Sequence, residues 1–176
     1  LDWLAQYLID NDWRLKPVHK LIMTSAAYSQ SSQFDKEKAK ADLGNQYLWR
    51  FEPHRVEAEI IRDSMLSVSD TLDETMFGPG TLDMGHKRRS IYFMIKRSQL
   101  IPFLQVFDSP EPLVSVGGRP ATTVAPQALV FMNSPYVREY ATNFAKQLLG
   151  TNATTEDIIK GGYWQTLSRD PTPQEL

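Results

Sequence analysis

Apolar side chains recur every three or four residues through most of this chain, and this spacing most constrains its fold. The clearest stripe runs through residues 53–72 and joins Ile61, Met65, Val68 and Leu72. Spacing of this kind places the side chains on one face of an α-helix, whereas a half-buried strand alternates apolar with polar residues. The sequence therefore predicts a mainly α fold, and we expect one helical domain spanning residues 1–176.

Similar stripes predict further helices and a buried core. The predicted helices cover, in chain order, residues 1–10, 17–28, 53–72, a short segment around Pro102, 126–132, 134–149 and 155–168. Gly161 and Gly162 interrupt the last of these and cost about 1 kcal/mol each relative to alanine. Close packing against another helix would explain this pair, and so would a break in the helix. The residues that we expect in the core are Ile61, Met65, Phe144 and Trp164.

Three segments do not follow the helical pattern. Residues 90–95, Ser-Ile-Tyr-Phe-Met-Ile, are aromatic and β-branched between basic residues, so they predict a short β element within residues 88–97. Residues 29–46 are polar and predict a solvated loop or a loosely held helical turn. Residues 108–121 contain three prolines and two adjacent glycines. They predict a long ordered loop, and loops of that length are often functional.

The composition excludes several classes of site. The chain has 176 residues, a formal charge of -2 and no cysteine. Without cysteine, disulfides, thiolate zinc sites, thiol nucleophiles and covalent haem attachment are excluded within this segment. The three histidines lack metal-ligand spacing, so we expect no metal and no cofactor here. The nearly balanced charge offers no basic field for nucleic acid, and no apolar run reaches the ~20 residues of a membrane span.

The last residues predict the beginning of another helix. Thr172, Pro173 and Glu175 have the residue types preferred at the N-cap, first and third positions of a helix. We therefore expect residues 172–176 to start a truncated helix, and the chain to be a fragment of a larger protein.

Polar residues gather around the 108–121 loop and form the first candidate site. Arginines beside threonine and asparagine could hold an anion such as a sulfate, a uronate or a phosphate. A structural role is the favoured alternative, with Asp108 paired to an arginine and Thr123 capping the next helix. We expect Arg119 and Asp108 to point toward one another or toward a shared anion. The candidate residues are Arg89, Lys96, Arg97, Asp108, Arg119, Thr122, Thr123, Gln127 and Asn133.

The second candidate site lies on the predicted helix 53–72 and comprises Glu59, Arg62 and Asp63. Glu59 and Asp63 are four residues apart and share a helix face. Paired carboxylates can cleave glycosidic bonds by acid–base catalysis. The structural alternative is an ordinary ion pair between Arg55 and Glu59 at the same helical spacing. Because one helix does not aim two carboxylates at one bond, no catalytic residue is identified and catalysis is not expected.

Several stretches together resemble one protein family. They are Trp13-Arg14-Leu15-Lys16, residues 19–28, 55–63 and 88–92, Phe107-Asp108-Ser109-Pro110-Glu111-Pro112, Arg119, Thr122-Thr123, residues 126–129, and Asn133-Ser134-Pro135. In order and spacing this set resembles a planctomycete-specific domain of unknown function, found near the C-terminus of large exported proteins. Many of those proteins also carry a planctomycete-type cytochrome c domain. The family pattern has a cysteine near Ser115 and two arginines where this chain has Gly118 and Arg119.

The resemblance implies a context rather than a reaction. It implies an exported bacterial protein, periplasmic or extracellular, with a c-type haem domain in some parents and a connection to polysaccharide breakdown. The function we expect is a non-catalytic scaffold or interaction domain whose partners are the flanking domains of the parent protein. One alternative is a module that binds or processes anionic carbohydrate through the 108–121 loop. Another is a partner module for a c-type haem domain.

Overall fold

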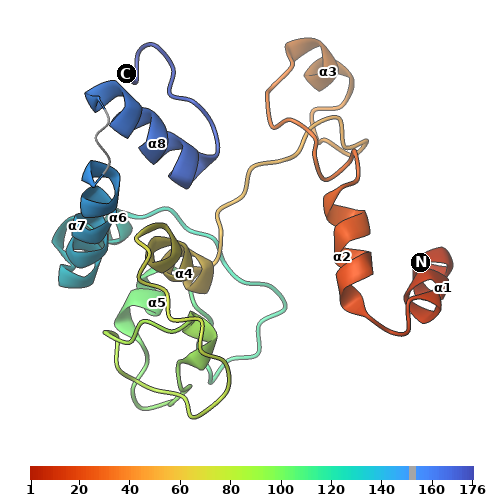
Figure 1. Cartoon of the computed structure of the whole chain (residues 1–176). Coiled ribbons are helices and arrows are strands. Elements are labelled where there is room, and N and C mark those ends of the chain that lie inside the picture. The colour runs from red at the N-terminus through yellow and green to blue at the C-terminus, as the bar shows by residue number, and fades with distance from the viewer. Residues whose placement is uncertain (151–153) are drawn as a thin grey trace. The chain divides into compact units, whose positions relative to one another are not determined.

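The prediction of a mainly α protein is confirmed by the structure, a computed structural model that describes residues 1–150 and 154–176 (Figure 1). Regular strands are absent from these residues, which contain isolated β-bridges only. None of the described helices is both long and apolar enough to cross a membrane. The helices are α1 (Asp2–Asp10), α2 (Leu15–Met23), α3 (Lys36–Ala41), α4 (Ala58–Val68), α5 (Pro102–Val106), α6 (Ala125–Asn133), α7 (Pro135–Leu149) and α8 (Thr155–Leu167).

The chain divides into two compact units, Leu1–His54 and Arg55–Leu176, a division that the single-domain prediction did not include. In the first unit, α1 packs on α2. The polar segment 29–46 contains the short helix α3. Asp35 caps α3, because its carboxylate accepts hydrogen bonds from the backbone N–H groups of Glu37 and Lys38 at 2.9 and 3.2 Å.

The second unit contains the larger apolar core. There α4 packs against α5 and α7, α6 packs on both α5 and α7, and α8 packs on α7. The α4 residues Ala58, Arg62 and Leu66 are buried and follow one another at four-residue spacing. The main apolar cluster comprises Ala58, Phe93, Ile101, Phe103, Leu104 and Phe107, with Ile61 and Met65 packed beside it.

The predicted core is therefore correct in part. Ile61 and Met65 are half-buried, because the innermost line of α4 lies one residue further along the helix. Phe144 is also half-buried. The prediction for Trp164 is wrong, since this residue is 54% exposed and its ring N–H donates to Asp170 at 2.8 Å.

The predicted β element at residues 88–97 is replaced by a 3₁₀ turn, Ser90–Tyr92, with isolated bridges at Arg88, Phe93 and Lys96. Side chains of α4 form hydrogen bonds with backbone groups of this segment that would otherwise pair with a neighbouring strand. The N–H of Ser90 donates to the Asp63 carboxylate at 2.7 Å, and the carbonyl of Arg88 accepts from Arg62 at 3.0 Å. Local composition favours a strand here, but these tertiary contacts outweigh it.

Gly161 and Gly162 lie beside α7, at distances where an added Cβ atom would make ordinary van der Waals contact, so the packing does not require glycine at either position. A Cβ atom added to Gly161 or Gly162 would lie 3.6 or 3.4 Å from the side chain of Leu148 on α7. The helix α8 continues through both glycines. Near the C-terminus, the N–H of Thr172 donates to the Glu175 carboxylate at 2.8 Å, as at a helix start, and residues 173–175 form a turn.

Candidate functional site

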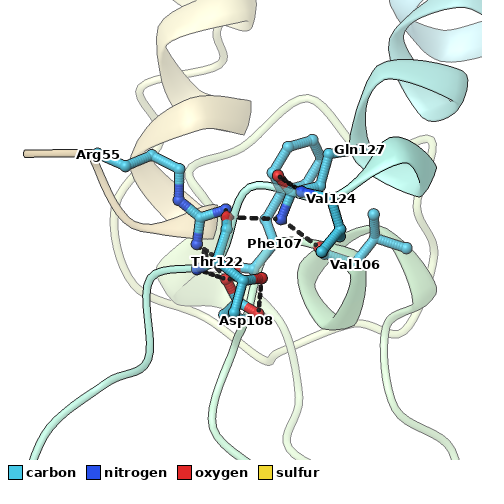
Figure 2. Close-up of polar contacts among 7 residues, drawn as sticks. All are labelled: Arg55, Val106, Phe107, Asp108, Thr122, Val124 and Gln127. Carbon is cyan, nitrogen blue, oxygen red and sulfur yellow. Dashed lines mark hydrogen bonds and ion pairs between the residues drawn. The ribbon is translucent and has the colours of Figure 1, made fainter.

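Four polar side chains tie the two ends of the 108–121 loop together, and we call Arg55, Asp108, Thr122 and Gln127 the clasp (Figure 2). Asp108 follows α5 with a φ of 63°, a left-handed conformation that aspartate tolerates better than most residues. Its carboxylate accepts hydrogen bonds from the Thr122 N–H at 2.8 Å and the Thr122 hydroxyl at 2.9 Å. It also forms an ion pair with the Arg55 guanidinium.

The remaining clasp contacts satisfy backbone carbonyls. Arg55 donates to the carbonyl of Thr122, and the buried Gln127 amide donates to the carbonyls of Val106 and Thr122, both at 3.1 Å. Figure 2 shows these groups converging from the lead-in to α4, the end of α5 and the start of α6. The clasp thus fixes where the loop leaves the core and where it returns.

The clasp stabilises the charged form of Asp108. The backbone hydrogen bond from Thr122, helped by the Thr122 hydroxyl and by Arg55, holds the pKa of Asp108 below its ordinary value of 3.8. A carboxyl whose pKa is lowered by folding stabilises the native state above the ordinary pKa. That contribution is lost as the pH falls through the lowered value.

We therefore expect Asp108→Asn to lower the melting temperature at neutral pH. The difference from the wild type should shrink as the pH is lowered below 3.8. Thermal unfolding followed by circular dichroism across this range would measure both effects. Thr123→Ala, at an exposed neighbouring position, is the matched control and should leave the melting temperature unchanged. A pH-independent difference for Asp108→Asn would contradict the assigned role of the carboxylate.

A groove of about 640 Å³ lies in the second unit, with the loop as one of its walls. The lead-in and first turns of α4 form the acidic wall, residues 89–96 form a wall that carries cations, and residues 109–114 close the third side. The apolar lining residues are Ile60, Ile91, Phe93, Met94, Ile95, Leu100, Ile101, Leu104, Pro110, Pro112 and Val114. The charged ones are Glu57, Glu59, Asp63, Arg89, Lys96, Glu111 and Arg119.

Arg119 reaches from the loop to the acidic wall. Its Nη1 lies 2.7 Å from the Glu59 carboxylate and 3.1 Å from the Glu57 carboxylate. The hydrogen bond to Glu59 raises the pKa of Arg119 further above its ordinary value. The expectation that Arg119 and Asp108 point toward one another is therefore wrong, because Arg55 takes the place beside Asp108, while a shared anion stays a prediction.

The second predicted site is divided between groove and core. Asp63 lines the groove, but its Oδ1 accepts both the N–H and the hydroxyl of Ser90 at 2.7 Å. Arg89 lies 3.8 Å from the other carboxylate oxygen of Asp63. Arg62 is 1% exposed and does not line the groove, and its guanidinium lies 4.8 Å from the centre of the ring of Phe93, which does. Burial lowers the pKa of Arg62.

The other predicted residues divide in the same way. Asp108, Thr122 and Gln127 meet in the clasp, while Arg89, Lys96 and Arg119 line the groove. Arg97, Thr123 and Asn133 are exposed and belong to neither group. Within residues 1–150 and 154–176, no three histidine, aspartate or glutamate side chains are arranged to hold a metal ion.

Sequence reasoning missed Arg55 and Glu57 as members of these groups. Arg55 stands 53 residues before its partner Asp108, and nothing in the local pattern links the two. The available signal was the Arg55–Glu59 spacing. It indicated a pair within one helix, although α4 begins only at Ala58.

No curated protein and no solved structure matches the chain. A family model named PSD1 and described as a protein of unknown function, DUF1553, matches residues 1–176. Because that match extends over the whole sequence, the chain belongs to the DUF1553 (PSD1) family.

Proposed function

We propose that this chain is a non-catalytic interaction domain whose groove binds an extended polypeptide segment with aliphatic and acidic side chains. The observation that carries the proposal is the exposure of Ile91 and Ile95 at the groove. These side chains are 74% and 80% exposed, although both are large and apolar. By the resemblance noted from the sequence, the parent is an exported protein, and its flanking domains are the expected source of the segment.

The apolar part of the groove suits a protein partner. Ile60, Met94 and Val114 are also exposed, so aliphatic atoms reach solvent on three sides of the groove. An exposed apolar surface with a polar rim is typical of a protein interaction site. Binding an aliphatic segment would remove this surface from water, which contributes favourable free energy in proportion to the area covered.

Charge on the walls favours an acidic partner. Lys96 has no ion-pair partner among the described residues, and Arg89, whose side chain is 64% exposed, lies 3.8 Å from Asp63. On the opposite wall, Glu57 and Glu59 share Arg119. The basic wall therefore keeps Lys96 available for an acidic group of a partner, whereas the opposite wall keeps one uncompensated negative charge, because Glu57 and Glu59 share a single guanidinium. Charge complementarity of this kind selects a partner and speeds its association.

The groove carboxylates support a role without catalysis. Glu59 is paired with Arg119, and Asp63 accepts two hydrogen bonds from Ser90. A general acid or base needs a proton that it can exchange with the substrate. Asp63 instead holds Ser90 against α4, and Glu59 is already engaged by Arg119.

A second candidate is a module for anionic carbohydrate. The observation in its favour is the concave groove itself, which contains Arg119 and the side-chain amides of Gln99 and Gln105. An acidic group of either ligand class would have to displace Glu57 or Glu59 to reach Arg119, so this contact does not separate the two candidates. The aliphatic lining offers a hydroxyl-rich ligand few partners, so this candidate ranks below a polypeptide.

Selection from a library of random displayed peptides tests the proposal. We expect the full chain to enrich peptides that combine aliphatic and acidic residues. Ile95→Asp should weaken their binding by about tenfold or more, which is about 1.4 kcal/mol, as measured by fluorescence anisotropy. Lys96→Glu should weaken the same peptides. Met132→Asp is the matched control, because Met132 is exposed on α6 outside the groove, and it should bind normally.

Two results would contradict the proposal. One is that the enriched peptides bind Ile95→Asp as tightly as the wild type, which would place binding elsewhere. The other is that oligogalacturonate raises the melting temperature of the wild type while no peptide motif is enriched. The second result would support the carbohydrate module instead, since a bound ligand stabilises the native state by mass action.

A further inference from the structure

The 108–121 loop has an unusual set of attachments to the rest of its unit. The clasp fixes its ends, and Arg119 fixes it again through Glu57 and Glu59. Between these points, residues 110–118 make no hydrogen bond or ion pair to any other part of the described chain. Their single backbone bond is internal, from the Val114 N–H to the Glu111 carbonyl at 3.2 Å.

The loop also carries little of the core. Leu113, Val114 and Val116 are all exposed, and a Cβ atom added to Gly117 or Gly118 would meet nothing within 4 Å. None of residues 110–118 belongs to the main apolar cluster or to the partly buried hydrophobic residues packed against it. Since the clasp is separate from the Arg119 contacts, the loop can swing away from the groove while both of its ends stay in place.

From these contacts we infer that residues 109–119 form a strap that gates the groove, and that the ion pairs of Arg119 with Glu57 and Glu59 are its latch. This inference rests on the proposed function, because it describes how a segment would gain entry to that same groove. With the latch closed, Ser109, Pro110 and Val114 form a wall of the groove. With the latch open, that wall moves away and the aliphatic lining is accessible from one more side.

The latch also couples the gate to an acidic partner. Arg119 is 37% exposed and Glu57 is 52% exposed at the side chain, so solvent and a partner can both reach the ion pair. A carboxylate on the incoming segment can replace Glu57 or Glu59 as the partner of Arg119. Exposed ion pairs are weakened by salt, because the Debye length falls to about 3 Å at 1 M. High salt therefore opens the latch without any partner.

Limited proteolysis tests the strap without a ligand. Thermolysin cleaves before aliphatic residues, and the strap offers Leu113, Val114 and Val116. In the full chain, Arg119→Gln should speed cleavage within residues 112–116 by about tenfold, since opening becomes more frequent, and leave the melting temperature unchanged. The double variant Glu57→Gln, Glu59→Gln should do the same. Salt at 1 M should speed cleavage of the wild type but not of Arg119→Gln.

Two controls separate gating from loss of fold. Arg119→Lys keeps the charge and should restore slow cleavage in large part. Arg89→Gln removes a groove cation that is not on the strap and should leave the cleavage rate as in the wild type. The inference is overturned if Arg119→Gln is cleaved at the wild-type rate. It is also overturned if cleavage accelerates throughout residues 55–176 with a lower melting temperature, because the ion pairs are then part of the fold.

Binding kinetics distinguish the strap from the proposed function. For the selected peptides with their acidic residues changed to Asn or Gln, so that loss of the Arg119 charge does not itself slow association, Arg119→Gln should raise the association rate constant by several-fold. An unchanged rate constant would overturn the gate even though the groove binds peptides. A third outcome is that cleavage responds as expected but no peptide binds. The proposed function and its gating then fail, whereas the ion pairs of Arg119 are still shown to hold the strap closed.

Discussion

Replacing Arg62 with methionine is expected to lower the free energy of unfolding of the second unit by about 3 kcal/mol or more, at about 1–3 kcal/mol for each buried acceptor that loses its donor. The Arg62 guanidinium donates to the carbonyls of His86 and Arg88 and to the hydroxyl of Ser90. Methionine fills much of the volume but leaves these acceptors without a donor. Buried polar groups without partners are costly. Urea unfolding, monitored through the hydrogen-exchange protection of the α4 amides, measures the change in the free energy of unfolding of that unit.

Arg89→Met provides the matched control for Arg62. It removes the same charged group from the same unit, but the Arg89 side chain is 64% exposed and its one ion pair is long. Substitutions at such surface positions usually change stability by no more than about 0.5 kcal/mol. Equal losses for the two variants would show that charge, rather than the buried hydrogen bonds of Arg62, determines the effect.

A second large loss is expected for Leu66→Ala. Leu66 is fully buried on α4, so truncation removes apolar contacts and leaves a cavity at a cost of about 2–5 kcal/mol. Ile60→Ala is the control on the same helix, because Ile60 is half exposed and lines the groove. Its cost should stay below about 1 kcal/mol. A smaller loss for Leu66→Ala than for Ile60→Ala would mean that the inward face of α4 is misassigned.

The helices of this chain can be predicted from its sequence because the residues that determine them lie close together in the chain. Apolar spacing and capping residues act within a few positions, and the predicted ranges coincide with α1, α5, α6, α7 and α8 to within a few residues. The limits of α4 and its innermost residues were less predictable. A search for apolar residues at helical spacing counts arginine as polar and places it on the outer face. Arg62 is nevertheless buried, because its guanidinium binds residues 86–90.

Part of the candidate site was also predictable. Asp108, Thr122 and Gln127 were grouped correctly because they stand at the two ends of the 108–121 loop. These ends meet when the loop folds back on the same unit. The arginine partners were exchanged: Arg55 binds Asp108, and Arg119 binds Glu57 and Glu59. Sequence spacing does not choose between two arginines when both pairings depend on tertiary packing. The same limitation applies to residues 90–95, whose backbone groups bind side chains of α4.

The position of Arg55 has a mechanical consequence. It is the first residue of the second unit, and its guanidinium is anchored on Asp108, beyond the end of α5. Tension transmitted along the chain from the first unit reaches this anchor before it reaches the first turn of α4 at Ala58. A pull on residues 53–54 would therefore load the contact of Arg55 with Asp108 before the helix that carries the buried Arg62.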